Sequence, residues 1–316
     1  MNERRPQILT AKMHSVDPTT AFEIGTLESH GDTDVGRVRS VNQDAWEEWQ
    51  DPEHQRHLLF VADGMGGHRG GEVASQIAVE EVGFVFKANA DDEPPSLLEE
   101  AFLRANRSIF DRAQADSDLR GMGTTGVALL LMGNQKGWVA HVGDSRLYRL
   151  RNNDLELLTG DHSVVGELIR RGQITQDEAR VHPQRNEILR AIGTRLNLAV
   201  DINAVDVQHG DRYLLCTDGL SGMLSDRQIE EVMGADPLSN VAPSLIECAN
   251  QAGGTDNVTL VVAEVPSAEK SESTHRPHRP GPEAAASGSG IRWLVLLALL
   301  GGLLFLFLGG SGSESN

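Results

Sequence analysis

Apolar positions recur with two different spacings between residues 24 and 266, and their alternation predicts a mixed fold. Apolar residues repeat every three to four positions, as on one face of a helix, at 71–86, 94–113, 162–183, 226–233 and 240–253. Continuous apolar runs, typical of buried strands, lie at 57–63, 125–132, 137–144, 146–150, 212–218 and 257–265. Short turns between consecutive strands, one of them at Asn152–Asn153, favour antiparallel hairpins over parallel crossovers. We therefore predict an α+β domain in which helices cover antiparallel sheet.

Two of the predicted helices carry an N-terminal signal. Ser96 and Glu99 have the spacing of a capping box, in which two side chains satisfy free backbone N–H groups at the start of a helix. Thr175 and Glu178 repeat the same spacing. We expect helices to begin at these two places.

The ends of the chain differ in composition from the domain at residues 24–266. Residues 1–23 show neither periodicity nor the apolar core of a secretory signal, so we interpret them as a flexible arm. Residues 267–290 are rich in Pro, Ser, Gly, Ala and His and are predicted to be a disordered linker. Residues 291–310 follow, with no charge from Trp293 onward. As a helix, the uncharged part spans about 27 Å, which favours a transmembrane helix over a buried core helix.

Charges flanking this apolar segment predict its orientation. Arg276, Arg279 and Arg292 precede the segment, whereas the tail at 311–316 carries one Glu and no basic residue. By the positive-inside rule, we expect a single-pass membrane protein whose N-terminal domain faces the cytoplasm.

Composition narrows the classes of function. The formal net charge is −18, from 46 acidic and 28 basic residues, so the phosphate backbone of a nucleic acid would be repelled. Aromatic residues make up only 4% of the chain, too few to predict a base-stacking platform. Cys216 lies in a strand-like run and Cys248 in a helix-like run, and two such cysteines do not suggest a disulfide framework. We therefore interpret both as reduced thiols. We expect no nucleic-acid partner.

Four aspartates lie at the ends of strand-like runs: Asp63, Asp144, Asp218 and Asp256. Taken alone, Asp63-Gly64 or Asp218-Gly219 is the signal of a hairpin turn, and Asp256-Asn257 is that of an Asx-turn. Together, however, strand ends can direct several carboxylates at one point, where they repel each other unless cations hold them. The pattern therefore predicts a hydrolytic centre with two Mg²⁺ or Mn²⁺ ions, which activate water without a protein nucleophile.

An anionic substrate entering such a pocket needs a positive group. Arg37 and Arg39 lie just ahead of Asn42-Gln43-Asp44, and the planar fork of an arginine matches a phosphate group. The alternative is a solvated surface charge, which is an even choice for Arg37.

Seven motifs then carry a resemblance to a known family. TDVGRVRSVNQDA, VADGMGGHRGGEVAS, GMGTT, HVGDSRLYRL, LTGDHS, LLCTDGL and GGTDNVTLVV follow one another between Thr33 and Val262. In this order and spacing, the chain resembles the metal-dependent protein phosphatases of the protein phosphatase 2C type, particularly the bacterial members. The resemblance implies a β-sandwich of two antiparallel sheets flanked by helices (α-β-β-α), with metals in a cleft at one end.

The resemblance also implies ligands for the two central metals. Asp63 is expected to bridge them, and the carbonyl group of Gly64 to bind one. Asp218 and Asp256 are expected to complete the second site. Asp44 would lie beside the metals as a ligand or through a coordinated water.

Further positions follow from the same resemblance. Arg39 matches the arginine that binds the substrate phosphate. Asp144 matches the aspartate that, with the equivalent of Asp218, holds a more weakly bound third metal in bacterial relatives. The segment at 164–184 corresponds to a flap beside the active site that is thought to influence substrate choice.

Two residues depart from the eukaryotic pattern. Gln43 stands where those members have a metal-contacting Glu, which implies weaker or water-mediated contact. Met65 stands where they have a His as a possible general acid, and a thioether cannot donate a proton. His68 or a metal-bound water is the candidate for that role, the alternative for His68 being a loop histidine without function. His162 either approaches the third metal or braces its loop.

These features predict a membrane-tethered enzyme that hydrolyses phosphoserine and phosphothreonine in proteins by a metal-activated water. Phosphorylated proteins are its expected substrates, and a Ser/Thr kinase acting on the same targets is an expected partner. A non-catalytic adaptor that binds phosphoproteins is the alternative from another class, because fold alone does not fix function. A metal nuclease would use similar chemistry, but the net charge of −18 counts against it.

Overall fold

The computed structural model describes residues 22–67 and 69–267. Four predicted features lie outside these residues, namely His68, the linker after its first residue, the transmembrane helix with its tail, and all of the predicted arm except its last two residues. Among the described helices, none combines the length and the apolar character needed to cross a membrane.

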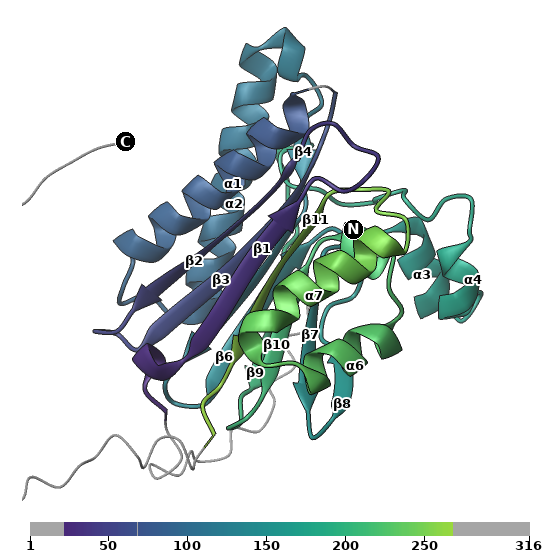
Figure 1. Ribbon diagram of the computed structural model, residues 1–316. Coiled ribbons are helices and arrows are strands. Elements are labelled where there is room, and N and C mark those ends of the chain that lie inside the picture. The colour runs from purple at the N-terminus through teal and green to yellow at the C-terminus, as the bar shows by residue number, and fades with distance from the viewer. Residues whose placement is uncertain (1–21, 68, 268–316) are drawn as a thin grey trace, which may run out of the picture. The chain divides into compact units, whose positions relative to one another are not determined.

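Two antiparallel sheets form the centre of the domain (Figure 1). The first has the order β1-β11-β10-β7-β8, and the second the order β2-β3-β5-β6-β9, with β4 paired to β3. The first sheet consists of β1 (Glu28–Asp34), β11 (Val258–Glu264), β10 (Arg212–Cys216), β7 (Arg146–Arg151) and β8 (Asp154–Leu157). The second consists of β2 (Asp44–Asp51), β3 (Arg56–Met65), β4 (Gly123–Thr124), β5 (Gly126–Met132), β6 (Lys136–Val142) and β9 (Asp201–Asp206).

Helices cover the outer face of each sheet. Helices α1 (Gly70–Ala88) and α2 (Pro94–Ala115) pack on the second sheet, whereas α6 (Asp226–Ala235) and α7 (Leu238–Gln251) pack on the first. Three short helices, α3 (Val164–Arg170), α4 (Gln176–Arg180) and α5 (Asp218–Ser221), lie near one end of the sandwich, and 3₁₀ turns occur at Ile24–Thr26 and Ser117–Leu119. The α+β sandwich of two antiparallel sheets flanked by helices is therefore confirmed.

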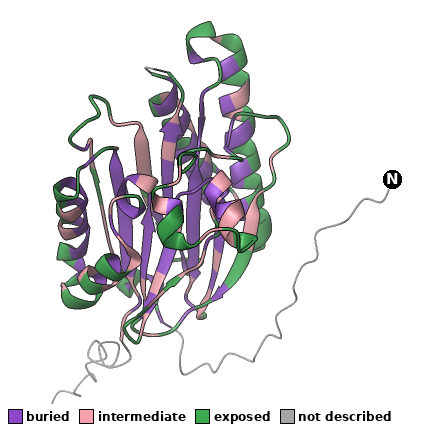
Figure 2. Ribbon diagram, turned by 90° about the vertical axis from the view of Figure 1, so that its right-hand side faces the viewer, coloured by how far each residue is buried: buried purple, intermediate pink, exposed green. Residues whose placement is uncertain are grey.

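The long apolar runs are explained by burial on both faces of the central strands. In β3, Leu59 and Val61 pack between the two sheets, while Leu58 and Phe60 pack against α1 and α2. A strand covered on both sides has no polar face, so its sequence does not alternate. Figure 2 shows buried residues along the strands and exposed residues along the outer helices.

The predicted signals at the ends of elements have mixed outcomes. Thr175 forms the predicted capping box with Glu178 at the start of α4. The prediction at Ser96 was wrong, because α2 already begins at Pro94 and its N-cap, Glu93, makes no side-chain cap. Proline favours this early start, since it needs no hydrogen bond for its nitrogen in the first turn.

Strand register gives the sandwich two different ends. At one end of the sandwich, strands β3, β6 and β10 end, and strands β2 and β11 begin. The end of β3 lies beside the start of β2. At the other end, Glu264 is paired with both Glu28 and Arg212. Phe22 and Pro266 also lie at this second end, where the ring of His209 contacts the Phe22 ring and His209 Nδ1 is 2.6 Å from the Pro266 carbonyl oxygen. The predicted aspartates all belong to the first end.

Candidate active site

Two of the predicted aspartates face each other across a strand pair. Asp44 begins β2, and its register partner is Asp63 near the end of β3. Thr125 holds the Asp63 backbone, since its Oγ1 accepts the Asp63 N–H at 2.9 Å and its own N–H donates to the Asp63 carbonyl at 2.8 Å. The Thr217 hydroxyl donates to Asp44 Oδ2 at 3.0 Å. Rigid strands and two threonines thus hold the two carboxylates together.

Asp218 and Asp256 reach the same end from the other sheet. Asp218 is the first residue of α5, directly after β10 and Thr217, and Asp256 precedes β11. Gly219 lies so close to the start of β11 that an added Cβ would stand 1.8 Å from the Asn257 carbonyl oxygen. Only glycine permits this approach. The hairpin-turn alternative does not occur at either Asp-Gly pair, because Asp63-Gly64 lies within β3 and Asp218-Gly219 opens α5.

The carboxylates are poorly solvated and repel each other. Burial, together with the charges of Asp44 and Asp218, raises the pKa of Asp63 well above its usual range. Burial raises the pKa of Asp44 to about 7, and the charges of Asp218 and Asp256 add to the effect. Burial and the charge of Asp218 raise the pKa of Asp144 to about 8. Without cations, Asp144 is therefore mostly protonated and Asp44 about half protonated at neutral pH, whereas a solvated aspartate is ionised.

The Asp144 carboxylate has a buried oxygen that is not hydrogen-bonded to the described residues. The side chain is buried just after the end of β6, and the atom concerned is Oδ1. An unsatisfied buried oxygen among other carboxylates has the chemistry of a ligand for a hard divalent cation. The residues present therefore fit Mn²⁺ or Mg²⁺.

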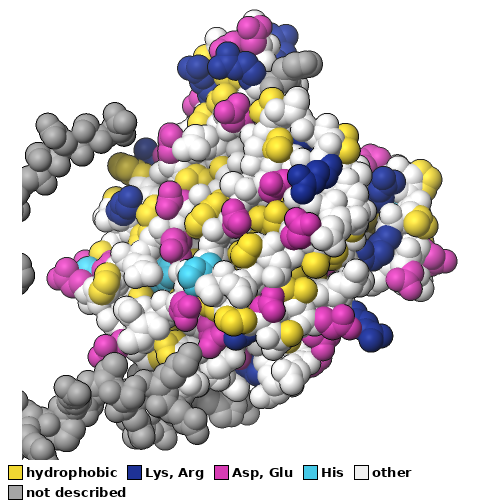
Figure 3. All heavy atoms as spheres, in the orientation of Figure 1, with side chains coloured by type: hydrophobic (Ala, Val, Ile, Leu, Met, Phe, Trp, Pro, Cys, Tyr) yellow, Lys and Arg dark blue, Asp and Glu magenta, His cyan; other side chains and the backbone are white. Residues whose placement is uncertain are grey.

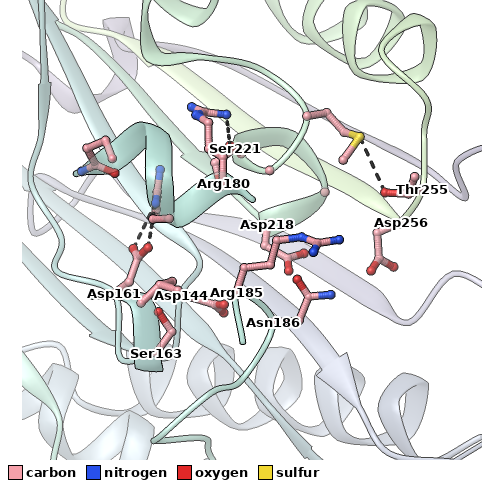
Figure 4. Close-up of a pocket in the computed structure, with 17 residues that line it drawn as sticks. Asp144, Asp161, Ser163, Arg180, Arg185, Asn186, Asp218, Ser221, Thr255 and Asp256 are labelled. Atoms are coloured by element: carbon pink, nitrogen blue, oxygen red, sulfur yellow. Dashed lines mark hydrogen bonds and ion pairs between the residues drawn. The ribbon is translucent and has the colours of Figure 1, made fainter. Parts of the chain in front are cut away.

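A pocket of about 140 Å³ opens beside these groups (Figure 4). Asp144, Asp218 and Asp256 line one part of its wall. Residues of α4, within the segment predicted to form a flap, line another part of the wall, together with Arg185 and Asn186 just after that segment. The structure thus places three of the predicted ligands in a cavity that a substrate can enter.

The two candidate arginines have different surroundings. Arg39 Nη2 lies 2.8 Å from Asp256 Oδ2, and the Arg39 side chain is half exposed. Arg37 faces Glu247 instead, at 3.9 Å. Of these two, Arg39 is therefore the one beside the carboxylate cluster, and its role in phosphate binding stays a prediction.

The glycine-rich segment after Asp63 is tightly packed against α1. A Cβ added at Gly64 would lie 2.0 Å from the Gly71 carbonyl oxygen. Met65 is paired with Gly123 of β4, and Gln43 Nε2 donates to the Gly66 carbonyl oxygen at 3.4 Å. This packing does not test the metal contact predicted for the Gly64 carbonyl group, which stays a prediction.

His162 braces the loop that carries Asp144. Its Nδ1 accepts the Gly143 N–H at 3.2 Å, its Nε2 lies 3.2 Å from Asp201 Oδ2, and its ring stacks on His141. The ligand atoms of His141, His162 and Asp201 lie within 4.8 Å of one another. Because Nδ1 accepts a hydrogen bond, Nε2 must carry the proton, which is then donated to Asp201. A metal on Nε2 would force a proton onto Nδ1, against the Gly143 N–H, so this group fits a brace better than a metal site.

Sequence reasoning missed several residues that organise the site. Thr125, Thr217 and Asn257 hold site backbones or carboxylates through hydroxyl or amide groups. Each lies within or next to a motif quoted above, but its position in the chain does not show which group it contacts. Asp161 is a further case, because it pairs with Arg146 at 2.7 Å beside the pocket.

The fold and the site define a metal-dependent hydrolase with clustered carboxylates, and comparison with known proteins identifies its family. The sequence model for "Protein phosphatase 2C" matches residues 35–259. The "Serine/threonine phosphatase stp" of Listeria monocytogenes is 40% identical over 237 residues, which cover 73% of this chain and 93% of that protein. The chain belongs to the protein phosphatase 2C family.

Solved structures agree with this assignment. The crystal structure of the Mycobacterium tuberculosis serine/threonine phosphatase PstP/Ppp has a TM-score of 0.68 and 39% identity, covering 76% of this chain and 99% of that one. The catalytic domain of PstP in complex with two manganese ions has a TM-score of 0.69 and 36% identity, covering 76% and 99%. The chain is thus a metal-dependent protein serine/threonine phosphatase, with Mn²⁺ or Mg²⁺ as its cofactor.

Proposed function

We propose that this phosphatase uses Asp63, Asp218 and Asp256 to hold two Mn²⁺ or Mg²⁺ ions, with Asp44 beside them. A third, weaker ion would be held by Asp144 and Asp218. The observation that carries this proposal is the convergence of five aspartates from both sheets, four of them with a raised pKa. When bound, the ions activate water for in-line attack on phosphorus and offset the charge of the phosphoryl oxygens.

The protein's own residues orient the substrate and the carboxylates. Arg39 is proposed to bind the phosphate of phosphoserine or phosphothreonine through its guanidinium group, which lies at the edge of the cluster beside Asp256. Thr217 keeps Asp44 aimed at the cluster. The pocket lined by Asp144 and Arg185 leaves room for the peptide around the phosphate. The general acid remains a prediction for His68 or a metal-bound water, and His68 lies outside the described residues.

Loss of the central carboxylate tests the proposal. We expect Asp63→Asn to lower kcat by on the order of 10⁴-fold, because the change removes a charge on which the whole metal centre depends. The measurement is release of phosphate from a phosphothreonine peptide with Mn²⁺. Glu247→Gln, which removes an exposed carboxylate facing Arg37, is the control and should retain activity. Equal activity of Asp63→Asn and the parent would exclude the proposed centre.

We further propose that the chain is anchored in a membrane by residues 291–310, with its catalytic domain in the cytoplasm. The support is the uncharged stretch from Trp293 to Gly310 and the arginines that precede it. Phosphorylated proteins near that membrane, and the kinase that modifies them, are the proposed partners. Recovery of the full chain in the salt-washed membrane fraction, and of a chain ending at residue 266 in the soluble fraction, is the expected result. A full chain that stays soluble would exclude the anchor.

A further inference from the structure

The loop that carries Arg39 joins β1 to β2 and has little apolar anchorage of its own (Figure 1). Residues 37–41 are all exposed, and the two valines among them, Val38 and Val41, are 68% and 43% exposed. A segment with so few buried apolar contacts owes its conformation to polar contacts. The position of Arg39 therefore depends on what holds the ends of this loop.

One buried side chain contacts both ends. Asn257 is 4% exposed, and its Nδ2 donates to the carbonyl oxygens of Val35 and Val41, each at 3.0 Å. Its Oδ1 accepts the N–H of Gln43 at 2.9 Å. The orientation of the amide is unambiguous, because carbonyl groups only accept and a backbone N–H only donates. The Nδ2 and Oδ1 groups of Asn257 thus join the two ends of the loop to each other.

Backbone contacts hold the closed loop against the segment from Gly254 to Asp256, which precedes β11. The Arg37 N–H donates to the Gly254 carbonyl oxygen at 2.7 Å. Gly36 has a φ of +82°, and a Cβ there would stand 2.2 Å from the Asp256 carbonyl oxygen. In this arrangement Arg39 Nη2 is 2.8 Å from Asp256 Oδ2. The same short segment thus supplies a predicted metal ligand, Asp256, and the support for the arginine.

We propose that Asn257 is a positioning residue for substrate phosphate, acting through Arg39. The inference rests on the proposed role of Arg39 as the phosphate-binding group. When the amide of Asn257 is removed, Val35, Val41 and Gln43 lose their common partner and the loop opens toward solvent. Arg39 then samples many positions away from the cluster, while the strand-held carboxylates remain in place.

A double-mutant cycle on the full chain tests this coupling. We expect Arg39→Ala and Asn257→Ala each to raise the KM for a phosphothreonine peptide on the order of tenfold, the effect of losing one hydrogen bond to a charged group. Inhibition by inorganic phosphate should weaken in parallel. The double variant should be no worse than Arg39→Ala alone, because both changes remove the same interaction. Binding of Mn²⁺, measured by calorimetry, should be unchanged in Asn257→Ala.

Asn106 provides a matched control in another part of the fold. It is 1% exposed, its Oδ1 accepts the Gly193 N–H at 2.7 Å, and its Nδ2 donates to the carbonyl oxygens of Arg195 and Leu196 at 2.9 and 3.1 Å. The chemistry matches that of Asn257, but the loop that it closes does not carry Arg39. Asn106→Ala is expected to lower Tm as Asn257→Ala does and to leave KM and phosphate inhibition unchanged.

The outcomes separate the inference from the proposed function. An unchanged KM in Arg39→Ala would refute the phosphate role of Arg39 itself. If Arg39→Ala raises KM but Asn257→Ala does not, or if the two effects multiply in the double variant, the positioning role is wrong. Loss of Mn²⁺ binding in Asn257→Ala would likewise count against it. Asn257→Asp, which keeps the acceptor for Gln43 but cannot donate to the two carbonyl groups, serves if the alanine variant does not fold, and the same KM increase is expected.

Discussion

At the scale of single residues, the site depends on close backbone approaches as well as on charge. Gly64 shows this most directly, because no side chain fits between the end of β3 and the start of α1. Its neighbour Asp63 is the proposed bridging ligand, so a shift at Gly64 would move the carboxylate. The glycine is thus required by packing beside the chemistry.

Gly64→Ala is expected to reduce activity and to destabilise the fold by about 1–3 kcal/mol, the usual effect of overpacking. Its Cβ would meet the Gly71 carbonyl oxygen at 2.0 Å, so a strand or a helix must move. Gly67→Ala is the matched control in the same segment, because among the described residues, its chain neighbours aside, nothing lies within 4 Å of its added Cβ. Phosphate release and thermal unfolding of both variants are the measurements. Equal effects at the two glycines would contradict the packing explanation.

How far the site could be predicted also differs from one residue to another. Asp63, Asp218 and Asp144 follow strongly apolar runs, so position alone indicated them. Asp44 does not follow such a run and was indicated only through the resemblance, although register places it opposite Asp63. Asn257 was quoted in a motif without a role, since its partners lie more than 200 positions earlier in the chain. Contacts of that range depend on strand pairing, which the local pattern does not contain.

At the scale of elements, central strands were predictable and edge strands were not. The six predicted strands are β3, β5, β6, β7, β10 and β11, all of them interior to their sheets. Five strands were missed: β1, β2, β8 and β9 are the edges of the two sheets, and β4 is a two-residue strand paired with β3. An edge strand such as β1, with the sequence ESHGDTD, is half exposed and has no apolar run. Pairing with β11 along its whole length, and not its own side chains, makes it a strand.

The short helices beside the pocket depend on their caps. Thr175→Ala removes the capping box of α4, whose residues line the pocket, and is expected to cost this helix about 1 kcal/mol. Faster amide hydrogen exchange within α4 is the expected result. Ser225→Ala removes the equivalent box of α6 and should speed exchange there instead. A uniform change across the domain in either variant would show that the caps do not act locally.

At the scale of the whole molecule, stability is linked to metal and to pH. In the metal-free protein, the pKa values of Asp44 and Asp144 are about 7 and about 8, above the ordinary value of 3.8. The folded chain therefore holds protons that the unfolded chain releases. This contribution is fully present below about pH 4 and is lost as the pH rises through about 7 and 8. The stability of the metal-free protein should thus fall as the pH rises from about 4 to about 8.

Bound ions should reverse this trend, because they replace the protons. With Mn²⁺ at 100 times its Kd, we expect about 2.7 kcal/mol of added stability, or roughly 5–10 °C in Tm. Calorimetry from pH 6 to 9, in chelator and in Mn²⁺, measures the difference in Tm between the two forms. The difference should widen as the pH rises. A constant difference would show that the carboxylates do not release protons on binding metal.

The domain surface carries mixed charges. On the face seen in Figure 3, acidic and basic side chains are interspersed among uncharged ones. Many of the arginines are paired, as Arg170 and Arg171 are with Glu167. Recognition of a phosphoprotein is therefore expected to depend on contacts in the pocket and at its rim more than on a long-range electrostatic field of the domain surface.

The two ends of the sandwich have a consequence for access. The nine residues from Val258 to Pro266 run from the carboxylate cluster to the opposite end, about 25–30 Å away at 3.3 Å per residue. Phe22 meets that same end through His209. Any partner, label or anchor joined to the domain at Phe22 or at Pro266 is therefore attached at the pole of the sandwich opposite the carboxylate cluster. Large phosphoproteins can approach the reactive pole without passing the attachment, and a fusion made at residue 22 or 266 should leave turnover intact.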